Sequence, residues 1–166
     1  IEGYIWDIKE GPALVAKAIR IAKQNGSTVA LSLSDSYCVE RHRNAFARAI
    51  QDDVTIVFAN EDEMMALYEV DKFDNVLAAI DRFDNLFVMT RAERGSVIVK
   101  GNTKIVQDAM VVKKIIDTTG AGDAYTAAFL YGWICGKTLD ECARLGTHIA
   151  TSVIQQIGAR IDKDVF

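Results

Sequence analysis

The stretch VTIVFA at residues 54–59 decides the fold class, because it is the clearest buried strand in the chain. It carries no charge, which is typical of a strand that is covered on both faces of a parallel sheet. Shorter apolar runs predict further strands at residues 4–6, 28–31 and 86–89.

Segments with the helical spacing of apolar residues alternate with these strands. A first helix opens at Gly11-Pro12 and stops at Asn25-Gly26, and others are expected at 39–51, 61–68, 73–83, 121–135 and 139–156. Gly101-Asn102 predicts a hairpin turn between strands at 95–100 and 104–106. This order predicts an α/β fold with a mostly parallel sheet and one antiparallel hairpin. In such sheets ligands bind beyond the carboxyl ends of the strands.

The composition is that of a globular chain of 166 residues, 50% of them hydrophobic and 25% charged. That balance excludes a disordered polar chain, and no apolar run approaches the roughly 20 residues of a membrane-spanning helix. The formal net charge of -4 argues against a protein that coats nucleic-acid phosphates. We therefore expect no nucleic-acid or membrane partner, and one domain or one piece of a larger one.

Cys38, Cys135 and Cys142 form no CxxC pair and are odd in number. Idle thiols in a reducing cytosol are therefore favoured over a disulfide framework or a cysteine-based zinc site. The chain begins at Ile1, without Met, a basic segment or a signal-type apolar run. We expect a cytoplasmic protein and a chain that is a piece of a longer one.

The strongest candidate site is DTTGAGD at residues 117–123, at the start of an apolar helix. The amides of residues 120–122 are placed to converge on an anion, supported by the positive end of the helix dipole. Asp123 lies in the first helical turn, where its carboxylate can take a proton from a hydroxyl that attacks a phosphoryl group. The alternative is a tight glycine turn in which Asp117 or Thr119 caps the helix.

A second candidate is NEDE at residues 60–63, which follows the strand at 54–59 directly. Three carboxylates in a row make a hard-oxygen environment that suits Mg²⁺, an ion that keeps several waters and takes one or two protein carboxylates. The alternative is an acidic first turn that complements the helix dipole. Beside the string at 117–123, a metal role for Glu63 is favoured.

The string at residues 117–123 resembles the second signature of the ribokinase-like (PfkB-type) carbohydrate and nucleoside kinases. The resemblance implies that the amides of Gly120, Ala121 and Gly122 form the anion hole for the transferring phosphate. It also implies that Asp123 is the catalytic base, with ATP as the phosphoryl donor and Mg²⁺ as its metal.

The segment TRAERG resembles the Thr-x-Gly-x-x-Gly nucleotide loop of the same family. The resemblance implies nucleotide contacts from Thr90, Arg91 and Gly95, although Ala92 stands where glycine is usual. Arg91 could clamp phosphates, and the alternative for it is a solvated loop charge. His148 lies on the last expected helix, which borders the adenine pocket in the family. For His148 a core or surface position without function is the alternative.

The remaining site residues are implied by the same resemblance. NEDE matches the family's Asn-x-x-Glu motif, so that Asn60 and Glu63 are expected to influence magnesium and phosphate binding. Asp117 and Thr119 are candidates for the monovalent-cation site, for K⁺, that some family members have.

The resemblance covers essentially the whole chain, 1–166, as a single domain piece, but corresponds only to the carboxyl-terminal half of the full fold. That fold is a three-layer α/β/α sandwich. The family's first signature, the lid strands and the residues that hold the acceptor are missing. Residues 31–43 look like bacterial members known as adenosine kinases or sugar kinases.

The function expected from these residues is ATP-dependent phosphoryl transfer to a hydroxymethyl group of a sugar or nucleoside, such as adenosine, a pentose or a hexose. The alternative is a truncated or degenerate relative that binds a nucleotide or a partner chain without turnover. A dinucleotide oxidoreductase is disfavoured, because no GxGxxG follows the first strand. Open strand edges predict a homo-oligomer or association with another chain.

Overall fold

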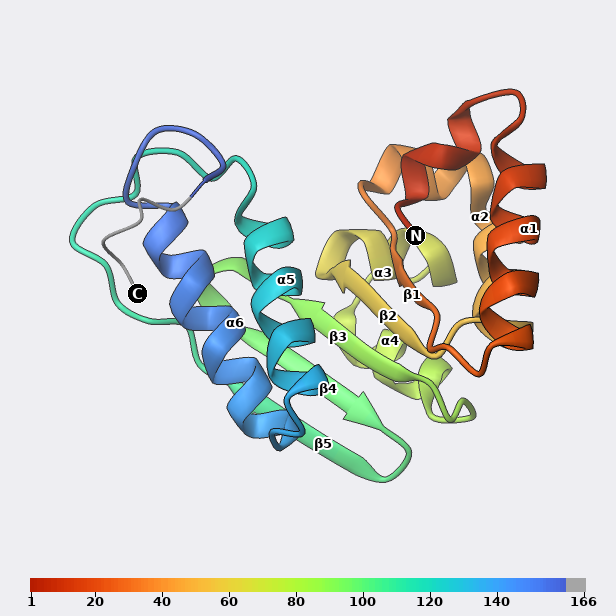
Figure 1. Cartoon of the computed structure of the whole chain (residues 1–166). Coiled ribbons are helices and arrows are strands. Elements are labelled where there is room, and N and C mark those ends of the chain that lie inside the picture. Colours follow the sequence, from red (N-terminus) through yellow and green to blue (C-terminus); the bar gives the residue numbers. More distant parts are fainter. Residues whose placement is uncertain (161–166) are drawn as a thin grey trace. The chain divides into compact units, whose positions relative to one another are not determined.

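The computed structural model describes residues 1–160 and has an α/β fold (Figure 1). Five strands follow the hydrogen-bonded order β1-β2-β3-β4-β5. The chain divides into two compact units: residues 1–89 with 99–103 form unit 1, and residues 90–98 with those from 104 onward form unit 2. The predicted alternation of strands and helices is confirmed, while the expectation of a single domain piece stays a prediction.

The helices and strands follow one another closely along the chain. In order they are η1 (Gly3–Asp7), α1 (Gly11–Gln24), β1 (Ala30–Ser32), α2 (Ser36–Asp52), β2 (Ile56–Asn60), α3 (Glu61–Tyr68), α4 (Phe73–Ile80), β3 (Leu86–Thr90), η2 (Ala92–Arg94), β4 (Ser96–Lys100), β5 (Thr103–Gln107), α5 (Ala121–Ile134) and α6 (Leu139–Val153). Within residues 1–160, none of the helices has both the length and the hydropathy that crossing a membrane requires.

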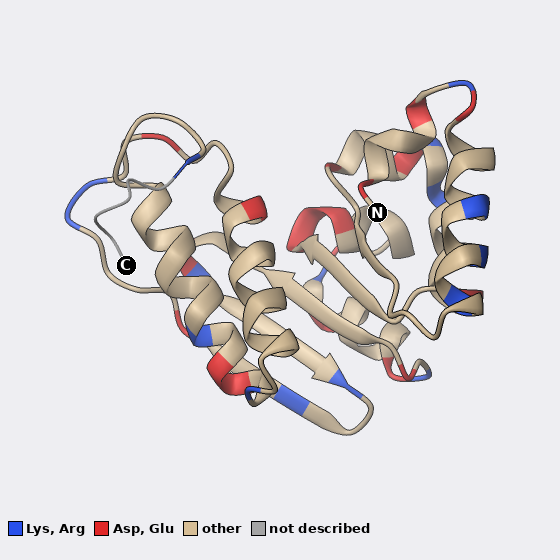
Figure 2. Ribbon diagram, viewed as in Figure 1, with Lys and Arg blue, Asp and Glu red and all other residues tan. Residues whose placement is uncertain are grey.

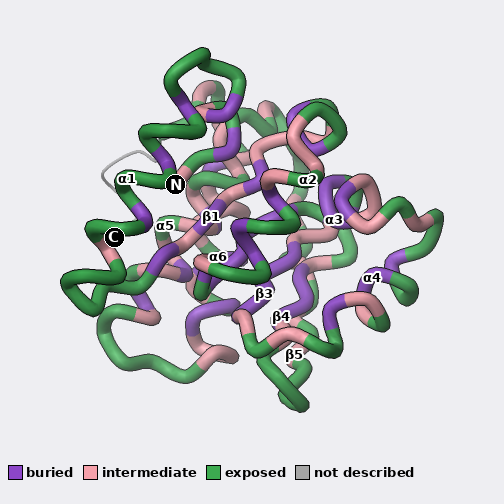
Figure 3. Tube along the Cα trace, turned by 90° about the vertical axis from the view of Figure 1, so that its right-hand side faces the viewer, coloured by how far each residue is buried: buried purple, intermediate pink, exposed green. Residues whose placement is uncertain are grey.

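The apolar run at residues 54–59 forms most of β2, as predicted. β2 pairs in parallel with β1, so that Leu31 faces Val57, and the amide of Leu86 donates to the carbonyl of Thr55 at 2.9 Å where β3 begins. The first four residues of β2 are buried, and Figure 3 shows buried segments in purple on strands and on the helices that cover them. Burial on both faces explains the absence of charge from this run.

The strand predicted at residues 4–6 is wrong, because these residues belong to η1, a 3₁₀ helix. The Glu2 carboxylate accepts a hydrogen bond from the Tyr4 amide at 3.1 Å and caps this turn. The Trp6 side chain is buried and packs edge-on against Phe46 of α2, with 5.0 Å between the ring centroids. The apolar run therefore reflects one buried ring, not pairing along a sheet.

Several helix bounds differ from those expected. α2 begins at Ser36 instead of residue 39, because the Asp35 carboxylate caps it by accepting a hydrogen bond from the Cys38 amide at 2.8 Å. α4 and α6 end earlier than predicted, at Ile80 and Val153. These differences are local, and they leave the order of the elements unchanged.

In unit 2, α5 and α6 lie side by side (Figure 1). Gly146 of α6 lies against the ring of Tyr125 of α5, where a Cβ would come within 2.9 Å of the ring. The buried Tyr125 hydroxyl is hydrogen-bonded to the Ser96 hydroxyl of β4 at 2.8 Å. This pair anchors the first half of α5 on β4.

The loop at residues 91–95 is held by two residues in the left-handed region. Ala92 has φ 50° and Gly95 has φ 77°, and the Arg91 amide donates to the Gly95 carbonyl at 2.7 Å. A Cβ at position 95 would lie 2.0 Å from the Gln107 carbonyl oxygen. Position 95 therefore requires glycine, and position 92 favours it.

We expect opposite effects on stability from Gly95→Ala and Ala92→Gly. Gly95→Ala adds a clash with backbone and should lower the free energy of unfolding by at least about 2 kcal/mol. Ala92→Gly relieves strain of roughly 1–3 kcal/mol while adding freedom to the unfolded chain, so stability should be unchanged or slightly raised. Urea denaturation measures both. Equal losses in the two variants would contradict this account of the loop.

Candidate active site

The loop at residues 117–123 leads into α5 through a sharp turn at Gly120. Gly120 is the amino-terminal cap of α5 and has φ 76°, a conformation that side chains rarely adopt. A Cβ there would also approach the Ala159 Cβ to 2.4 Å. The glycine is therefore demanded by the turn itself, whatever else it does.

The amides at the start of α5 are not all available to a ligand. The Ala121 amide donates to the Thr118 carbonyl at 3.1 Å, which closes a turn. Among residues 1–160, no acceptor is bonded to the amides of Gly122 and Asp123, which lie in the first helical turn. A Cβ built at Gly122 would meet nothing within 4 Å. As far as the described residues go, this turn thus carries N–H groups without an acceptor.

Asp117 ties the loop down instead of facing outward. One carboxylate oxygen accepts from the Thr119 amide at 2.9 Å, and the other accepts from the Gly158 amide at 3.0 Å. Hydrogen bonds from the Thr119 hydroxyl and amide and from the Gly158 amide hold the pKa of Asp117 below its ordinary value. Asp117 therefore joins the loop before α5 to the segment that follows α6.

Asp123 is exposed in the first turn of α5, next to the free Gly122 amide. A carboxylate at this position is favoured by the positive end of the helix dipole. It is also accessible to a hydroxyl group from solvent or from a ligand. A proton acceptor and anion-binding amides therefore occupy the same helical turn.

The other predicted nucleotide residues of unit 2 occupy two places. Thr90 and Arg91 are half-buried at the end of β3, and Gly95 closes the loop before β4. This loop is connected to α5 through Ser96, the next residue, which bonds to Tyr125. His148 is exposed on α6, and within the described chain its side chain makes no hydrogen bond to the loop at 117–123.

The Ser96–Tyr125 hydrogen bond is a feature that sequence reasoning missed. Ser96 is fully buried, and burial raises the pKa of Tyr125 to about 12. Ser96 and Tyr125 are 29 residues apart in the chain, so no local pattern could have revealed the pair. The one sequence signal was a serine at the start of the strand Ser96–Lys100, directly before the apolar residues 97–99.

In unit 1, Asn60 and Glu63 form a reciprocal capping box at the start of α3. The Glu63 amide donates to the Asn60 side-chain oxygen at 2.8 Å, and the Asn60 amide donates to one Glu63 carboxylate oxygen at 2.9 Å. The Asn60 side-chain amide donates to the other Glu63 oxygen at 2.6 Å. Both carboxylate oxygens of Glu63 are therefore engaged within the cap.

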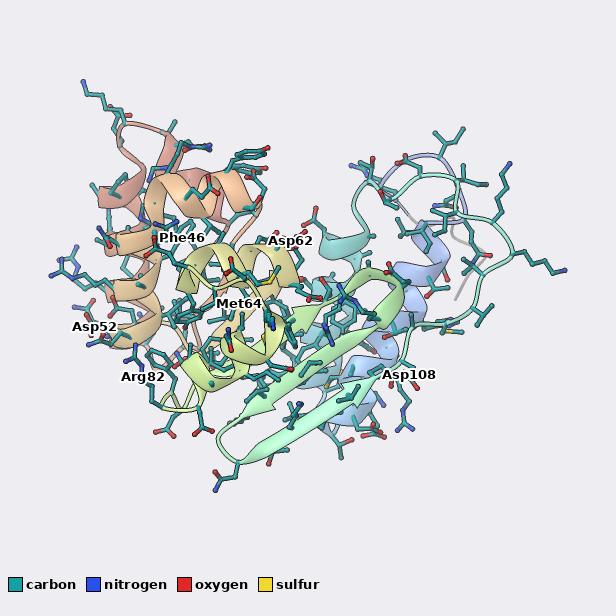
Figure 4. All side chains as sticks on the ribbon, turned by 180° about the vertical axis from the view of Figure 1, so that it is seen from behind. Phe46, Asp52, Asp62, Met64, Arg82 and Asp108 are labelled. Carbon is teal, nitrogen blue, oxygen red and sulfur yellow. The ribbon has the colours of Figure 1, made fainter. Side chains whose placement is uncertain are left out.

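The first turn of α3 is the most acidic short segment near a strand end. Figure 2 shows its red acidic turn, and Figure 4 labels Asp62, which is exposed, and Met64, which is buried. Glu63 is only 5% exposed, and burial raises its pKa to about 7 despite the hydrogen bond from the Asn60 amide. The predicted acidic turn is present, with Glu63 turned into the protein.

Comparison with known proteins identifies the family to which these motifs belong. The sequence profile of the pfkB family of carbohydrate kinases matches residues 9–165. The chain belongs to this family. The pfkB match covers the loop at 117–123 and the acidic turn at 60–63 together.

Related pfkB-type kinases extend the comparison. An uncharacterized sugar kinase of Archaeoglobus fulgidus is 35% identical over 111 residues, which are 67% of this chain and 44% of that protein. The crystal structure of adenosine kinase from Sinorhizobium meliloti is 42% identical, with a TM-score of 0.95 over 99% of this chain and 50% of that one. A probable sugar kinase from Rhizobium etli gives 39% identity and a TM-score of 0.95, with 99% and 50% covered.

These matches confirm the predicted ribokinase-like α/β fold. They also confirm the resemblance to adenosine kinases and sugar kinases. The chain spans about half the length of the relatives it matches. The individual site residues in this chain stay predictions.

The buried Glu63 carboxyl predicts a pH dependence of stability, measured in EDTA so that metal plays no part. Because its folded pKa of about 7 lies above its ordinary 4.5, the folded chain keeps a proton that the unfolded chain loses in this interval. The free energy of unfolding should therefore fall as pH rises from about 4.5 to about 7.

Glu63→Gln removes this dependence. Relative to the parent, the free energy of unfolding of the variant should rise by about 1–3 kcal/mol between pH 4.5 and pH 8, because only the parent loses stability over this interval. Urea denaturation at both pH values measures it, and Asp62→Asn, an exposed carboxylate in the same turn, is the matched control. A difference that stays flat would show that Glu63 is not held in a desolvated site.

Proposed function

We propose that this chain supplies ATP binding and the catalytic base for phosphoryl transfer to a hydroxymethyl group of a sugar or nucleoside. The observation that carries the proposal is the first turn of α5. There the exposed Asp123 carboxylate lies beside the amides of Gly122 and Asp123, which have no acceptor among residues 1–160, with open space at Gly122. A base and an anion site in one turn fit phosphoryl transfer.

In the proposed reaction, the acceptor hydroxyl attacks the γ-phosphorus while Asp123 takes its proton. A new O–P bond forms, the bond to the leaving ADP oxygen breaks, and ADP carries the electron pair away. The amides at the start of α5 stabilise the negative charge spread over the transferring group. Gly120 contributes the turn that aims these amides, and Ala121 contributes through its place in that turn.

For the nucleotide, we infer a contact surface from the loop at residues 90–95. Thr90 ends β3, Arg91 follows it, and Gly95 keeps the loop close to β5. An arginine in such a loop can bind phosphate oxygens in a bidentate manner. His148 is exposed on α6 and is the weakest of the proposed nucleotide contacts.

The metal proposed for this reaction is Mg²⁺, which neutralises phosphate charge when it is bound. The acidic turn of α3 suits an ion that keeps most of its waters. Because both Glu63 oxygens accept hydrogen bonds from Asn60, we assign this pair to shaping the turn and its charge. Each of these oxygens keeps a second lone pair, but direct ligation by Glu63 would require the ion to reach a side chain that is only 5% exposed.

A monovalent cation such as K⁺ remains part of the proposal through Asp117 and Thr119. The Asp117 carboxylate already accepts hydrogen bonds from two backbone amides. These bonds hold its negative charge in the loop before α5. A cation there would strengthen the closure of this loop. Its effect would be seen as a dependence of activity on K⁺ in place of Na⁺.

The second candidate function is a binding module without turnover, and the length of the chain supports it. Relatives are about twice as long. The family's first signature and the residues that hold the acceptor are missing from this sequence. Positioning contributes about 7–11 kcal/mol to such reactions. The 166-residue chain alone is therefore expected to bind ATP without acceptor-dependent turnover.

The proposed function is tested in the complete gene product with ATP, Mg²⁺ and a panel of adenosine, ribose and fructose, by following ADP. Asp123→Asn should lower kcat by at least the roughly 10²–10⁴-fold typical of a general base. ATP affinity should change much less, because Asn fits the same exposed position. Near-normal kcat in this variant would remove the base assignment. ATP binding without ADP release from any acceptor would support the binding module.

Gly122→Ala separates the needs of the helix from those of the anion site. Gly122 is helical and a Cβ there meets nothing within 4 Å, so the variant should be as stable as the parent or up to about 1 kcal/mol more stable. The same methyl group enters the space where a phosphate would approach, so ATP binding and turnover should fall, and fall further in Gly122→Val. Titration calorimetry and thermal denaturation measure both. Unchanged phosphoryl transfer in the valine variant would show that this glycine serves the turn alone.

A further inference from the structure

Asp7, Cys38 and His42 bring together a carboxylate oxygen, a thiol sulfur and an imidazole nitrogen in unit 1. One ligand atom from each residue lies within 4.8 Å of the other two. The cluster uses residues of η1 and α2 only. None of them takes part in the proposed phosphoryl transfer.

The fold brings these residues together in two steps. Cys38 and His42 are four residues apart on α2, so they share one face of that helix. Asp7 ends η1, and the neighbouring Trp6 ring packs on Phe46 of α2, which is labelled in Figure 4. The packing of two apolar rings thus places the carboxylate against the helix face that carries the thiol and the imidazole.

The backbone of α2 departs from helical geometry within the cluster. His42 has φ −118° and ψ 17° inside an otherwise continuous helix. Its Nε2 atom lies 2.6 Å from an Asp7 carboxylate oxygen, and its ring also contacts Phe46 with 6.2 Å between centroids. The imidazole is therefore held toward Asp7 from two sides.

Arg41 fixes the orientation of the Asp7 carboxylate. Its Nη2 atom donates to one oxygen at 2.6 Å, and its Nε donates to the other at 3.1 Å. Hydrogen bonds from a neighbouring side chain to a ligating group commonly set its direction toward a metal. The oxygen that accepts from Arg41 Nε is also the one that lies 2.6 Å from His42 Nε2.

Burial separates the cluster from an ordinary surface ion triad. The Asp7 side chain is 38% exposed and the His42 side chain 23% exposed, whereas Cys38 is fully buried. The ion pairs of Asp7 with Arg41 and His42 do not involve the Cys38 thiol, so they do not account for its position beside them. The partly exposed carboxylate and imidazole each offer a ligand atom within 4.8 Å of the buried thiol.

We propose that Asp7, Cys38 and His42 bind one divalent transition-metal ion of the Zn²⁺ class, with water in the fourth position. Thiolate, imidazole and carboxylate are the ligands that Zn²⁺ takes in proteins, and magnesium or calcium would not select a sulfur ligand. In a tetrahedral site such ligand atoms lie roughly 3.3–3.8 Å apart. The His42 Nε2 atom and the Asp7 oxygen, now 2.6 Å apart, would therefore separate on binding, and all three ligand atoms already lie within 4.8 Å of one another.

Binding replaces the hydrogen bond between His42 and Asp7 with two metal bonds. The thiol proton of Cys38 leaves to solvent, so that thiolate and carboxylate neutralise the two charges of the ion. The metal then joins η1 to α2, which the chain connects through about 30 residues. The expected result is a stiffer unit 1.

The test uses Co²⁺ as a spectroscopic stand-in for Zn²⁺ on the full chain, with folding checked by circular dichroism. We expect one equivalent to bind, with a thiolate-to-cobalt charge-transfer band in the near ultraviolet that added Zn²⁺ removes. Added Zn²⁺ should also raise the temperature of thermal unfolding. Failure to observe the charge-transfer band would overturn the proposal.

Variants assign the ligands. Cys38→Ser should abolish the band, whereas Cys135→Ser, at an exposed cysteine in unit 2, should leave it intact. Asp7→Asn and His42→Gln change exposed or half-buried positions and should weaken Co²⁺ binding by at least about 10-fold without unfolding the chain. A band that persists in Cys38→Ser, or unchanged affinity in both Asp7→Asn and His42→Gln, would place the metal elsewhere and refute the site.

Discussion

Backbone amides without an intrahelical acceptor are the constraint on which the starts of α3 and α5, each in its own unit, depend. Every helix begins with such amides, and in an α/β fold they gather where strands end. At α3 the Asn60 side chain accepts a hydrogen bond from the Glu63 amide, and the Glu63 carboxylate accepts one from the Asn60 amide. At α5 no side chain caps the helix, and the turn at Gly120 leaves the next amides open. One helix start is closed by a capping box, and at the other the absence of a side-chain cap is the basis of the proposed anion site.

The residues around the open turn all serve to keep it in place. Asp117 uses both carboxylate oxygens to join the loop to the segment after α6. Tyr125, two residues after Asp123, is bonded to Ser96 in a buried position. Rigid support on both sides of an exposed carboxylate is what preorganised catalysis requires. The polar atoms that do chemistry in the proposal are thus surrounded by polar atoms that only hold the backbone.

The same structure shows how a motif can carry two meanings. Asn60 and Glu63 match a pattern linked to magnesium, yet their hydrogen bonds make a capping box that any helix could use. Burial of Glu63 raises the pKa of its carboxyl group although the cap's hydrogen bond from the Asn60 amide favours the charged form, so burial opposes charge at that position. Ala92 is a similar case, because it occupies a left-handed conformation that suits the glycine usual in the family. In both places the backbone requirement is visible in the structure, while the ligand role is a proposal.

By itself, the sequence determined the order of strands and helices, the buried strand at residues 54–59 and the turn of glycines before α5. These follow from periodicity, from missing charge and from bonds that span three or four residues. It did not determine that the run at residues 4–6 coils into η1, because the burial of Trp6 depends on Phe46, 40 positions away in the chain. Nor could it place Ser96 under Tyr125, Asp117 against Gly158, or Asp7 beside Cys38 and His42. Those contacts join residues 29 to 41 positions apart, and only the packing of side chains in three dimensions brings such partners within bonding distance.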